Sequence, residues 1–184
     1  MKENATELIA QLRSNAVEAF DRLIEQYGDR LYWHIRRVVV QHEEAEDVLQ
    51  DTFTRAYLSI GDFRGETESS LIAWLYRIAT SAAIKALQKR KKWAFASIDS
   101  VRSSLLATFE QELDPSADEI VVRLQKAILA LPTKQRLVFN MRYYDELSFE
   151  EISQATGQSV STLKTNYHYA VQKIKEQVRV IEIE

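Results

Sequence analysis

The 184-residue sequence contains no cysteine, only two prolines, only four glycines and no long apolar run. Without cysteine the chain can form neither disulfide bonds nor thiolate sites, which fits a reducing compartment. Scarce glycine and proline argue against a β-rich or loop-rich protein, because these residues supply turns. We find no apolar stretch of about 18 residues that could cross a membrane and no basic-then-apolar leader. We therefore expect a soluble, cytoplasmic protein that does not insert into a membrane.

The residues that are abundant favour helix: alanine, leucine, glutamate, glutamine, lysine and arginine dominate the composition. Apolar residues recur at three- and four-residue spacing over 5–40, 43–60 and 70–92, and a compact helical unit follows from about 118. Between them, 96–117 is acidic and serine-rich, and we expect a linker with one or two helical turns. The sequence predicts an all-α protein with two small domains, 1–95 and 118–184, joined by an acidic linker at 96–117.

The charge is unevenly distributed along the chain. The formal net charge is −3, but residues 96–120 alone contain six acidic side chains and one basic side chain. The two ends are neutral or slightly basic. Counterion release scales with the number of phosphates contacted, so ends of this kind would bind free DNA weakly. A DNA-binding role would therefore need a partner that docks the protein on DNA.

The stretch LSFEEISQATGQSVSTLKTNY has the layout of a helix-turn-helix. Ser148 and Glu151 form the capping-box pattern S-x-x-E. Gly157 falls in the turn, where a positive φ is often needed, and Ser159 is placed to cap the second helix. The second helix presents short polar side chains on one face: Ser161, Thr162, Lys164, Thr165 and His168. Such a face can enter a major groove and contact bases or phosphates, although a plain helical hairpin with a polar outer face gives the same pattern.

A second candidate surface lies on the helix expected at 70–92. No aspartate or glutamate occurs between Ser69 and Ile98. One helical stripe contains mainly basic and amide side chains: Arg77, Ser81, Lys85, Gln88 and Lys92. A basic stripe suits a phosphate backbone. Basic residues at a helix C-terminus also complement the macrodipole, but that explains only the last turn of this helix.

The helix expected at 43–60 has an outer face of opposite character, with Asp47, Gln50 and Asp51 among its polar residues. This face has the wrong sign for DNA and would suit a basic protein surface. An ordinary solvated helix face is the alternative, since acids are favourable near a helix N-terminus.

No catalytic or metal-binding arrangement is present in the sequence. His34, His42 and His168 lack the spacing of metal ligands, and each is expected to be a surface or interface side chain. We find no nucleophile–base pattern and no Walker-type loop. The sequence therefore predicts a protein that is not an enzyme and needs no metal or other cofactor.

These elements, in this order, resemble the extracytoplasmic-function (ECF) group of bacterial RNA polymerase sigma factors. AEDVLQDTFTRAY is similar to the helix of that family that binds core polymerase. FRGETESSLIAWLYRIATSAAIKALQKRKK resembles its −10 segment, and the stretch from LPTKQRLVF to AVQKIKE resembles its −35 domain. The resemblance spans nearly the whole chain.

The resemblance implies a role for each candidate surface. Asp47, Gln50 and Asp51 match positions that contact a basic coiled coil of core RNA polymerase. The −10 contacts would come from Arg64 together with the basic stripe, and the loop from Asp62 to Ser70 would hold a flipped base of the melted non-template strand. The helix-turn-helix would bind the double-stranded −35 element. The resemblance further implies an anti-sigma factor as partner.

Two other classes of protein remain as alternatives from the residues alone. A stand-alone helix-turn-helix regulator would use the same reading helix without polymerase, but its low basic charge and the acidic face at Asp47 do not fit that role. A helical interaction scaffold would leave the acid-free stretch from Ser69 to Ile98 without a function. The sequence favours a transcription initiation factor.

Overall fold

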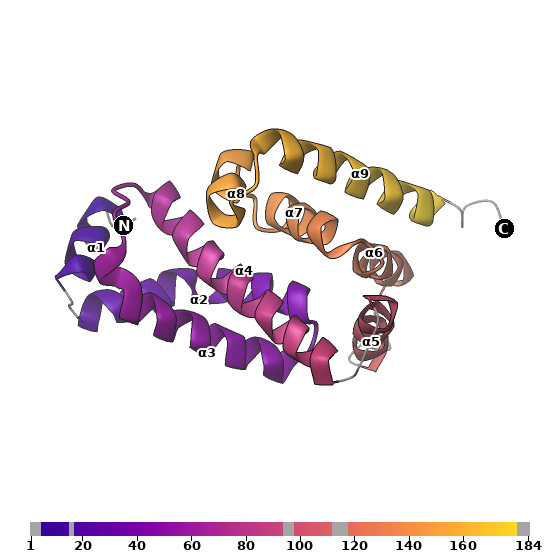
Figure 1. The fold of residues 1–184 in the computed structure, drawn as a ribbon, viewed down its shortest axis with the longest axis horizontal. Helices are drawn as coiled ribbons and strands as arrows, with labels where there is room; N and C mark the ends of the chain where they lie inside the picture. The colour runs from indigo at the N-terminus through magenta and orange to yellow at the C-terminus, as the bar shows by residue number, and fades with distance from the viewer. Residues whose placement is uncertain (1–4, 15–16, 94–97, 112–117, 180–184) are drawn as a thin grey trace.

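The computed structural model describes residues 5–14, 17–93, 98–111 and 118–179 (Figure 1). These residues form helices and turns and contain no strand, so the predicted all-α class is confirmed. The elements are α1 (Ala5–Arg13), α2 (Val17–Val39), α3 (His42–Ser59), a 3-10 turn η1 (Ile60–Asp62), α4 (Glu68–Trp93), α5 (Ile98–Gln111), α6 (Glu119–Leu129), α7 (Thr133–Tyr143), α8 (Phe149–Thr156) and α9 (Val160–Arg179).

The N-terminal domain consists of α1 to α4, with α2, α3 and α4 packed against one another (Figure 1). Its core contains fully buried side chains from α2 and α4, such as Leu23, Leu31, Ile35, Leu71 and Leu75. Gly28 lies inside α2 and does not interrupt it, because packing of the apolar face outweighs the poor helix propensity of one glycine.

The C-terminal domain consists of α6 to α9 and contains the predicted helix-turn-helix in α8 and α9. The capping box is formed, with Ser148 accepting from the Glu151 backbone and Glu151 accepting from the Ser148 backbone. Gly157 adopts φ 72°, the left-handed conformation expected for it in the turn. The hydroxyl of Ser159 accepts from the backbone N–H of Thr162 at 3.2 Å, as predicted for a cap. Local cap chemistry therefore fixes where both helices begin.

Helix α5 differs from the prediction of one or two helical turns in the acidic linker. It is 14 residues long, and Leu105 on it is buried, with Leu106 and Phe109 packed against the core. The Nζ of Lys126 also lies 2.6 Å from Glu110 Oε1. Tertiary burial of an apolar stripe stabilises a helix whose serine-rich sequence alone does not favour it. The remainder of the predicted linker, with Pro115, lies outside the described residues.

The two domains pack directly on each other. Helix α8 lies across α4, and α2 also contacts α7 (Figure 1). Leu147, Ile152 and Ala155 are buried and belong to the same apolar cluster as the core of the N-terminal domain. This arrangement is closed, since the core continues from one domain into the other.

Candidate protein- and nucleic-acid-binding surfaces

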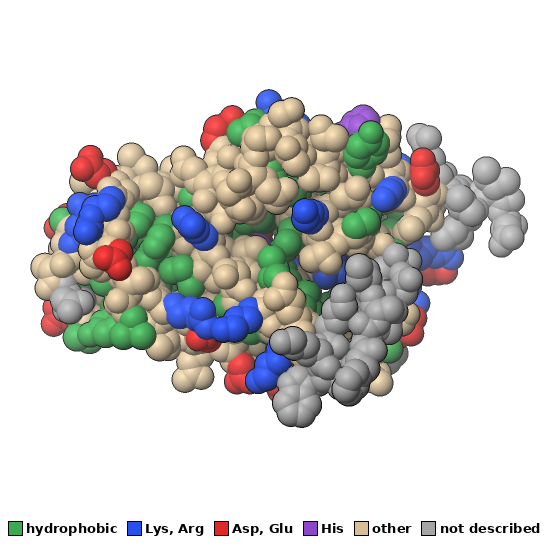
Figure 2. Space-filling view, in the orientation of Figure 1, with side chains coloured by type: hydrophobic (Ala, Val, Ile, Leu, Met, Phe, Trp, Pro, Cys, Tyr) green, Lys and Arg blue, Asp and Glu red, His purple; other side chains and the backbone are tan. Residues whose placement is uncertain are grey.

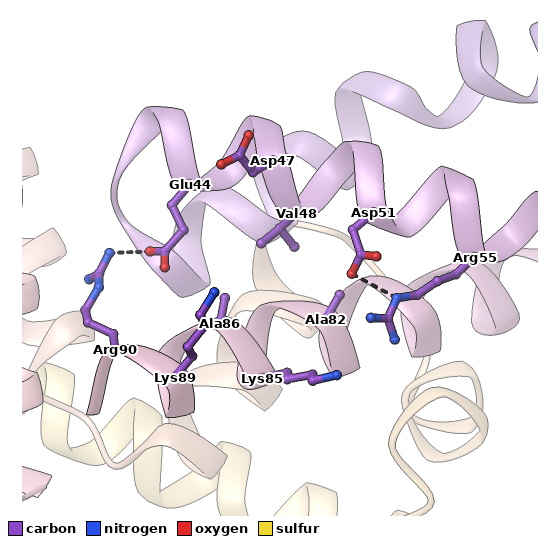
Figure 3. Close-up of a pocket in the computed structure, with 10 residues that line it drawn as sticks. All are labelled: Glu44, Asp47, Val48, Asp51, Arg55, Ala82, Lys85, Ala86, Lys89 and Arg90. Carbon is purple, nitrogen blue, oxygen red and sulfur yellow. Dashed lines mark hydrogen bonds and ion pairs between the residues drawn. The ribbon is translucent and has the colours of Figure 1, made fainter. Parts of the chain in front are cut away.

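A groove runs between α3 and α4, and its two walls have opposite charge (Figure 3). Val48, Ala82 and Ala86 are the apolar residues that line it. The charged lining residues are Glu44, Asp47, Asp51 and Arg55 from α3, and Lys85, Lys89 and Arg90 from α4. Small side chains on both helices allow the charged groups to line a continuous surface depression.

Two ion pairs organise this groove. The Nε of Arg55 donates to Asp51 Oδ2 at 2.8 Å, and both side chains are about half exposed. Arg90 pairs with Glu44 and also donates to Gln41 Oε1 at 3.2 Å, so it ties the end of α4 to the start of α3. Burial raises the pKa of Glu44 and outweighs the lowering by Arg90. Exposed pairs such as Asp51 with Arg55 contribute little stability, so a partner can replace them at small cost.

The three residues predicted to bind core polymerase are all exposed on α3, but they do not share one groove. Asp47 and Asp51 line the groove between α3 and α4, whereas Gln50 lines a second groove between α2 and α3. The residues of this α2–α3 groove are mainly aromatic or apolar inside and acidic at the rim: Phe20, Ile24, Leu49, Phe53 and Tyr57, with Glu25, Asp29 and Glu46.

Residue spacing does not reveal the α2–α3 groove, because Tyr57 falls on the same helical stripe as the buried residues Phe53 and Ile60. Tyr57 is 44% exposed, and its ring meets that of Phe20 edge-on at 5.1 Å. The acids Glu25 and Asp29, four residues apart on α2, were the available signal. Helical phase alone cannot show that the apolar edges of two neighbouring helices remain uncovered.

Most of the predicted −10 residues are brought together on α4. Arg77, Ser81, Lys85 and Gln88 are exposed along one side of the helix, and Lys85 is the one that also lines the α3–α4 groove. Lys92 belongs to α4, but its side chain lies outside the described residues. Arg64 lies apart from this stripe, in the segment after η1, where its guanidinium donates to the carbonyl of Gly61.

The loop before α4 is held in a defined shape. A side chain at Gly65 would meet the ring of Phe63 at 2.5 Å, and Phe63 in turn packs on Trp74 with ring centroids 4.9 Å apart. The Gly65 carbonyl accepts from Arg13 at 2.7 Å, and Ser70 Oγ accepts from the Thr67 backbone at 3.1 Å. The loop therefore presents a fixed backbone next to the exposed stripe of α4.

The predicted −35 residues lie together on the outer face of α9: Ser161, Thr162, Lys164, Thr165 and His168 are all exposed. On the opposite face Leu163, Ala170 and Ile174 are buried. Lys164 Nζ lies 5.8 Å from the centroid of the Phe149 ring, which holds its aliphatic stem near α8. The helix thus offers a narrow hydroxyl-rich surface that fits a major groove.

The histidines divide into two environments. His42 and His168 are exposed, whereas His34 is completely buried at the contact between the two domains. Among the residues that the structure describes, no cluster of three His, Cys, Asp or Glu side chains could hold a metal ion. No helix in the described part of the chain has the length and apolar character needed to cross a membrane.

Comparison with known proteins assigns both halves of the chain to one family. The model of sigma-70 region 2 matches residues 23–93, and the model of sigma-70 region 4 matches residues 122–174. The ECF RNA polymerase sigma factor SigW of Bacillus subtilis is 31% identical over 179 residues, covering 93% of this chain and 95% of that protein. RNA polymerase sigma factor YlaC of the same organism is 30% identical, covering 86% of this chain and 91% of that protein.

Solved structures share the fold. The structure of CnrH in complex with the cytosolic domain of CnrY superposes with a TM-score of 0.69 at 22% identity, covering 96% of this chain and 97% of that one. The sigma factor RpoE of Bartonella quintana, in complex with the anti-sigma factor NepR, gives a TM-score of 0.68 at 18% identity, covering 90% of this chain and 99% of that one.

The chain is a transcription initiation factor, and it belongs to the ECF group of RNA polymerase sigma factors. It directs promoter-specific transcription, and the predicted sigma-factor function is confirmed at that level.

Proposed function

We propose that this sigma factor docks on core RNA polymerase through the outer face of α3, with Asp47, Gln50 and Asp51 as its central contacts. The main support is the set of acids on α3, where Asp47 and Asp51 line one wall of the α3–α4 groove and Glu46 lies at the rim of the α2–α3 groove. Acids line each of them, and the α2–α3 groove adds exposed aromatic surface such as Tyr57. A basic, helical surface of the polymerase would fit there, because charge complementarity fixes its register and the aromatic groove supplies apolar contact area.

The DNA contacts would come from surfaces that are basic or hydroxyl-rich rather than acidic. The exposed stripe on α4, together with Arg64, would contact the −10 element, and the fixed loop from Asp62 to Ser70 would hold a base extruded from the non-template strand. The hydroxyl-rich face of α9 would read the −35 element in the major groove. The small number of basic residues on these faces supports a division of labour in which polymerase supplies most of the affinity and sigma supplies the choice of promoter.

Further properties follow from membership of this group. The protein would act in the cytoplasm as a binding protein rather than an enzyme, with an anti-sigma factor as its regulator. Its functional boundaries would be 1–95 for core and −10 binding, 96–117 for the acidic linker and 118–184 for −35 binding. RpoE of Bartonella quintana, whose fold is similar, was solved in complex with the anti-sigma factor NepR.

Titration of the purified, labelled chain with purified bacterial core RNA polymerase tests the docking. We expect tight one-to-one binding that competes with the housekeeping sigma factor, and specific transcription by the resulting holoenzyme. The chain alone should give little mobility shift of promoter DNA. A folded chain that bound promoter DNA tightly and core polymerase not at all would contradict the proposal.

A further inference from the structure

A carboxylate of the C-terminal domain is inserted into the N-terminal domain. Asp145 lies just after α7, and its Oδ2 is 2.8 Å from His34 Nδ1 on α2. Its Oδ1 accepts from Nη1 of Arg37 at 3.0 Å. The other ring nitrogen of His34, Nε2, lies 2.9 Å from Thr80 Oγ1 on α4. We call these four residues, His34, Arg37, Thr80 and Asp145, the interdomain clasp.

Three of the four clasp residues are buried, the side chain of Arg37 is 25% exposed, and further hydrogen bonds lie at the edges of the clasp. The relative exposure is 0% for His34, 5% for Thr80 and 6% for Asp145. The carbonyl of Asp145 accepts from Nη2 of Arg30 at 3.2 Å. Farther along α4, Ser69 Oγ donates to Glu151 Oε1 on α8 at 2.9 Å. A carboxylate is removed from water here only because His34 and Arg37 of the other domain each bind one of its oxygens, so the contact is specific for one arrangement of the domains.

This closed arrangement holds the two DNA-binding faces too close together for a promoter. Helix α9 packs on α8, and α8 packs on α4; packed helices lie about 8–10 Å apart, so α4 and α9 are separated by roughly 20 Å. The −10 and −35 elements lie about 25 base pairs apart, which is roughly 85 Å of duplex. One closed molecule cannot contact both elements at once.

The candidate core-binding residues do not share this constraint. Asp47, Gln50 and Asp51 are exposed in the closed arrangement, because α8 covers α4 from a different side. Core polymerase can therefore reach α3 before the domains separate. The closed contact acts on the step at which the C-terminal domain moves away from α4.

We propose that the interdomain clasp is an autoinhibitory contact within this chain. The free protein is held closed by Asp145 without any other protein, and Asp145 must leave the pocket formed by His34, Arg37 and Thr80 before both promoter elements are engaged. Because only the open state can contact both promoter elements, binding of the holoenzyme to the promoter shifts the population towards it. The apparent affinity of the holoenzyme for a promoter is then reduced by the fraction of molecules that are open.

The distance between the domains can be measured directly, because a chain without cysteine accepts two unique labels. Fluorophores would be placed at Asp21→Cys on α2 and Gln172→Cys on α9, two exposed positions outside all the proposed contacts. We expect a short inter-dye distance in the free wild-type background. In the complex with core polymerase and promoter DNA the distance should lengthen by tens of Å, as the spacing of the promoter elements demands.

The substitution Asp145→Asn removes the charge and keeps the shape, and Glu146→Gln is its matched control. Glu146 is the exposed neighbour of Asp145 and takes no part in the clasp. We expect Asp145→Asn to give the long distance already in the free protein, with an unchanged helical circular-dichroism spectrum and an apparent affinity of the holoenzyme for promoter DNA about tenfold tighter. Glu146→Gln should behave as wild type.

Two results would overturn the proposal: a folded Asp145→Asn protein with the short distance, or a transcribing promoter complex in which the wild-type distance stays short. Should Asp145→Asn not fold, the double substitution Arg30→Gln and Ser69→Ala removes two bonds across the interface from exposed side chains. That variant should shift part of the population to the long distance, and no shift would equally overturn the proposal. A wild-type chain that did not bind core would contradict the sigma-factor docking and not the clasp, whose free-state distance is measured without polymerase.

Discussion

Asp51 in the α3–α4 groove and Asp145 in the interdomain clasp are both aspartates that form ion pairs with basic side chains. The first pair is exposed to solvent, whereas Asp145 is buried. Asp51 pairs with Arg55 one helical turn away, and about half of each side chain is exposed. Asp145 pairs with His34 and Arg37 across more than a hundred residues of sequence, and only 3% of its side chain is exposed.

The difference shows how burial decides what a carboxylate can do. In water, the pair of Asp51 and Arg55 is weak, and either group can exchange its partner for one on another protein. In the interior, the pairing of Asp145 is costly to break, because the groups left behind have no water to replace it. One aspartate is therefore available to a partner, and the other holds the chain together.

The largest expected effect comes from replacing each of the two aspartates with alanine. We expect Asp145→Ala to lower the free energy of unfolding by about 3 kcal/mol, because it leaves a buried histidine and a partly buried arginine without their carboxylate. Asp51→Ala should change it by about 0.5 kcal/mol or less. Urea unfolding followed by circular dichroism measures both, and equal losses would mean that burial does not distinguish the two sites.

Reversing the charge of the exposed aspartate tests its availability to a partner. Asp51→Arg should weaken binding to core RNA polymerase by about a hundredfold. The introduced positive charge would face a basic partner surface, and like charges repel. The fold should survive, because the change is on an exposed helix face. The control is Asp21→Arg, the same charge change on an exposed part of α2. Core affinity that falls equally in both variants would exclude a specific role for the α3 face.

Substitutions on α9 test whether the exposed faces act independently. Lys164→Ala and Thr165→Ala should each reduce transcription from a −35-dependent promoter by about tenfold, the loss expected for one base or phosphate contact. Their affinity for core polymerase should be unchanged. In vitro transcription and core titration separate the two activities, and parallel losses in both would show that α9 does more than contact DNA.

The smallest effect concerns Glu151, which links the α8 capping box to Ser69. Burial raises the pKa of Glu151, but hydrogen bonds from the Ser148 backbone, the Ser148 hydroxyl and Ser69 outweigh it, so the pKa is lowered from 4.5. A lowered pKa means that the ionised form stabilises the fold above pH 4.5, and that this stabilisation is lost as the pH falls through the folded-state value.

Glu151→Gln should therefore cost about 1 kcal/mol at neutral pH, the usual value of a cap. When the pH is lowered, this variant should also lose less stability than the wild-type protein. Glu150→Gln, on the exposed neighbour of Glu151, should leave the pH dependence unchanged. Urea unfolding between pH 3 and pH 7 compares the two variants, and identical acid profiles would contradict the role given to Glu151.

Features that depend on neighbouring residues could be predicted from the sequence. The capping box at Ser148 and Glu151, the turn at Gly157 and the exposed phase of Asp47 and Asp51 follow from spacing over a few residues. The burial of Leu105 could not be predicted, since it depends on helices elsewhere in the fold. The pairing of His34 with Asp145 spans 111 positions and leaves no local pattern. Long-range contacts of this kind decide which predicted surfaces remain open.

Helix α5 has a consequence for the range of promoters that the protein can use. As a helix, its 14 residues span about 21 Å, whereas the same residues extended would reach roughly 48 Å. If Leu105 left the core and α5 unfolded, the same residues could span this larger distance between the domains. A weaker apolar face on α5 would let the helix unfold more readily, so the protein would tolerate a wider range of spacer lengths between the −10 and −35 elements. A stronger apolar face would restrict transcription to promoters whose elements lie at a single separation.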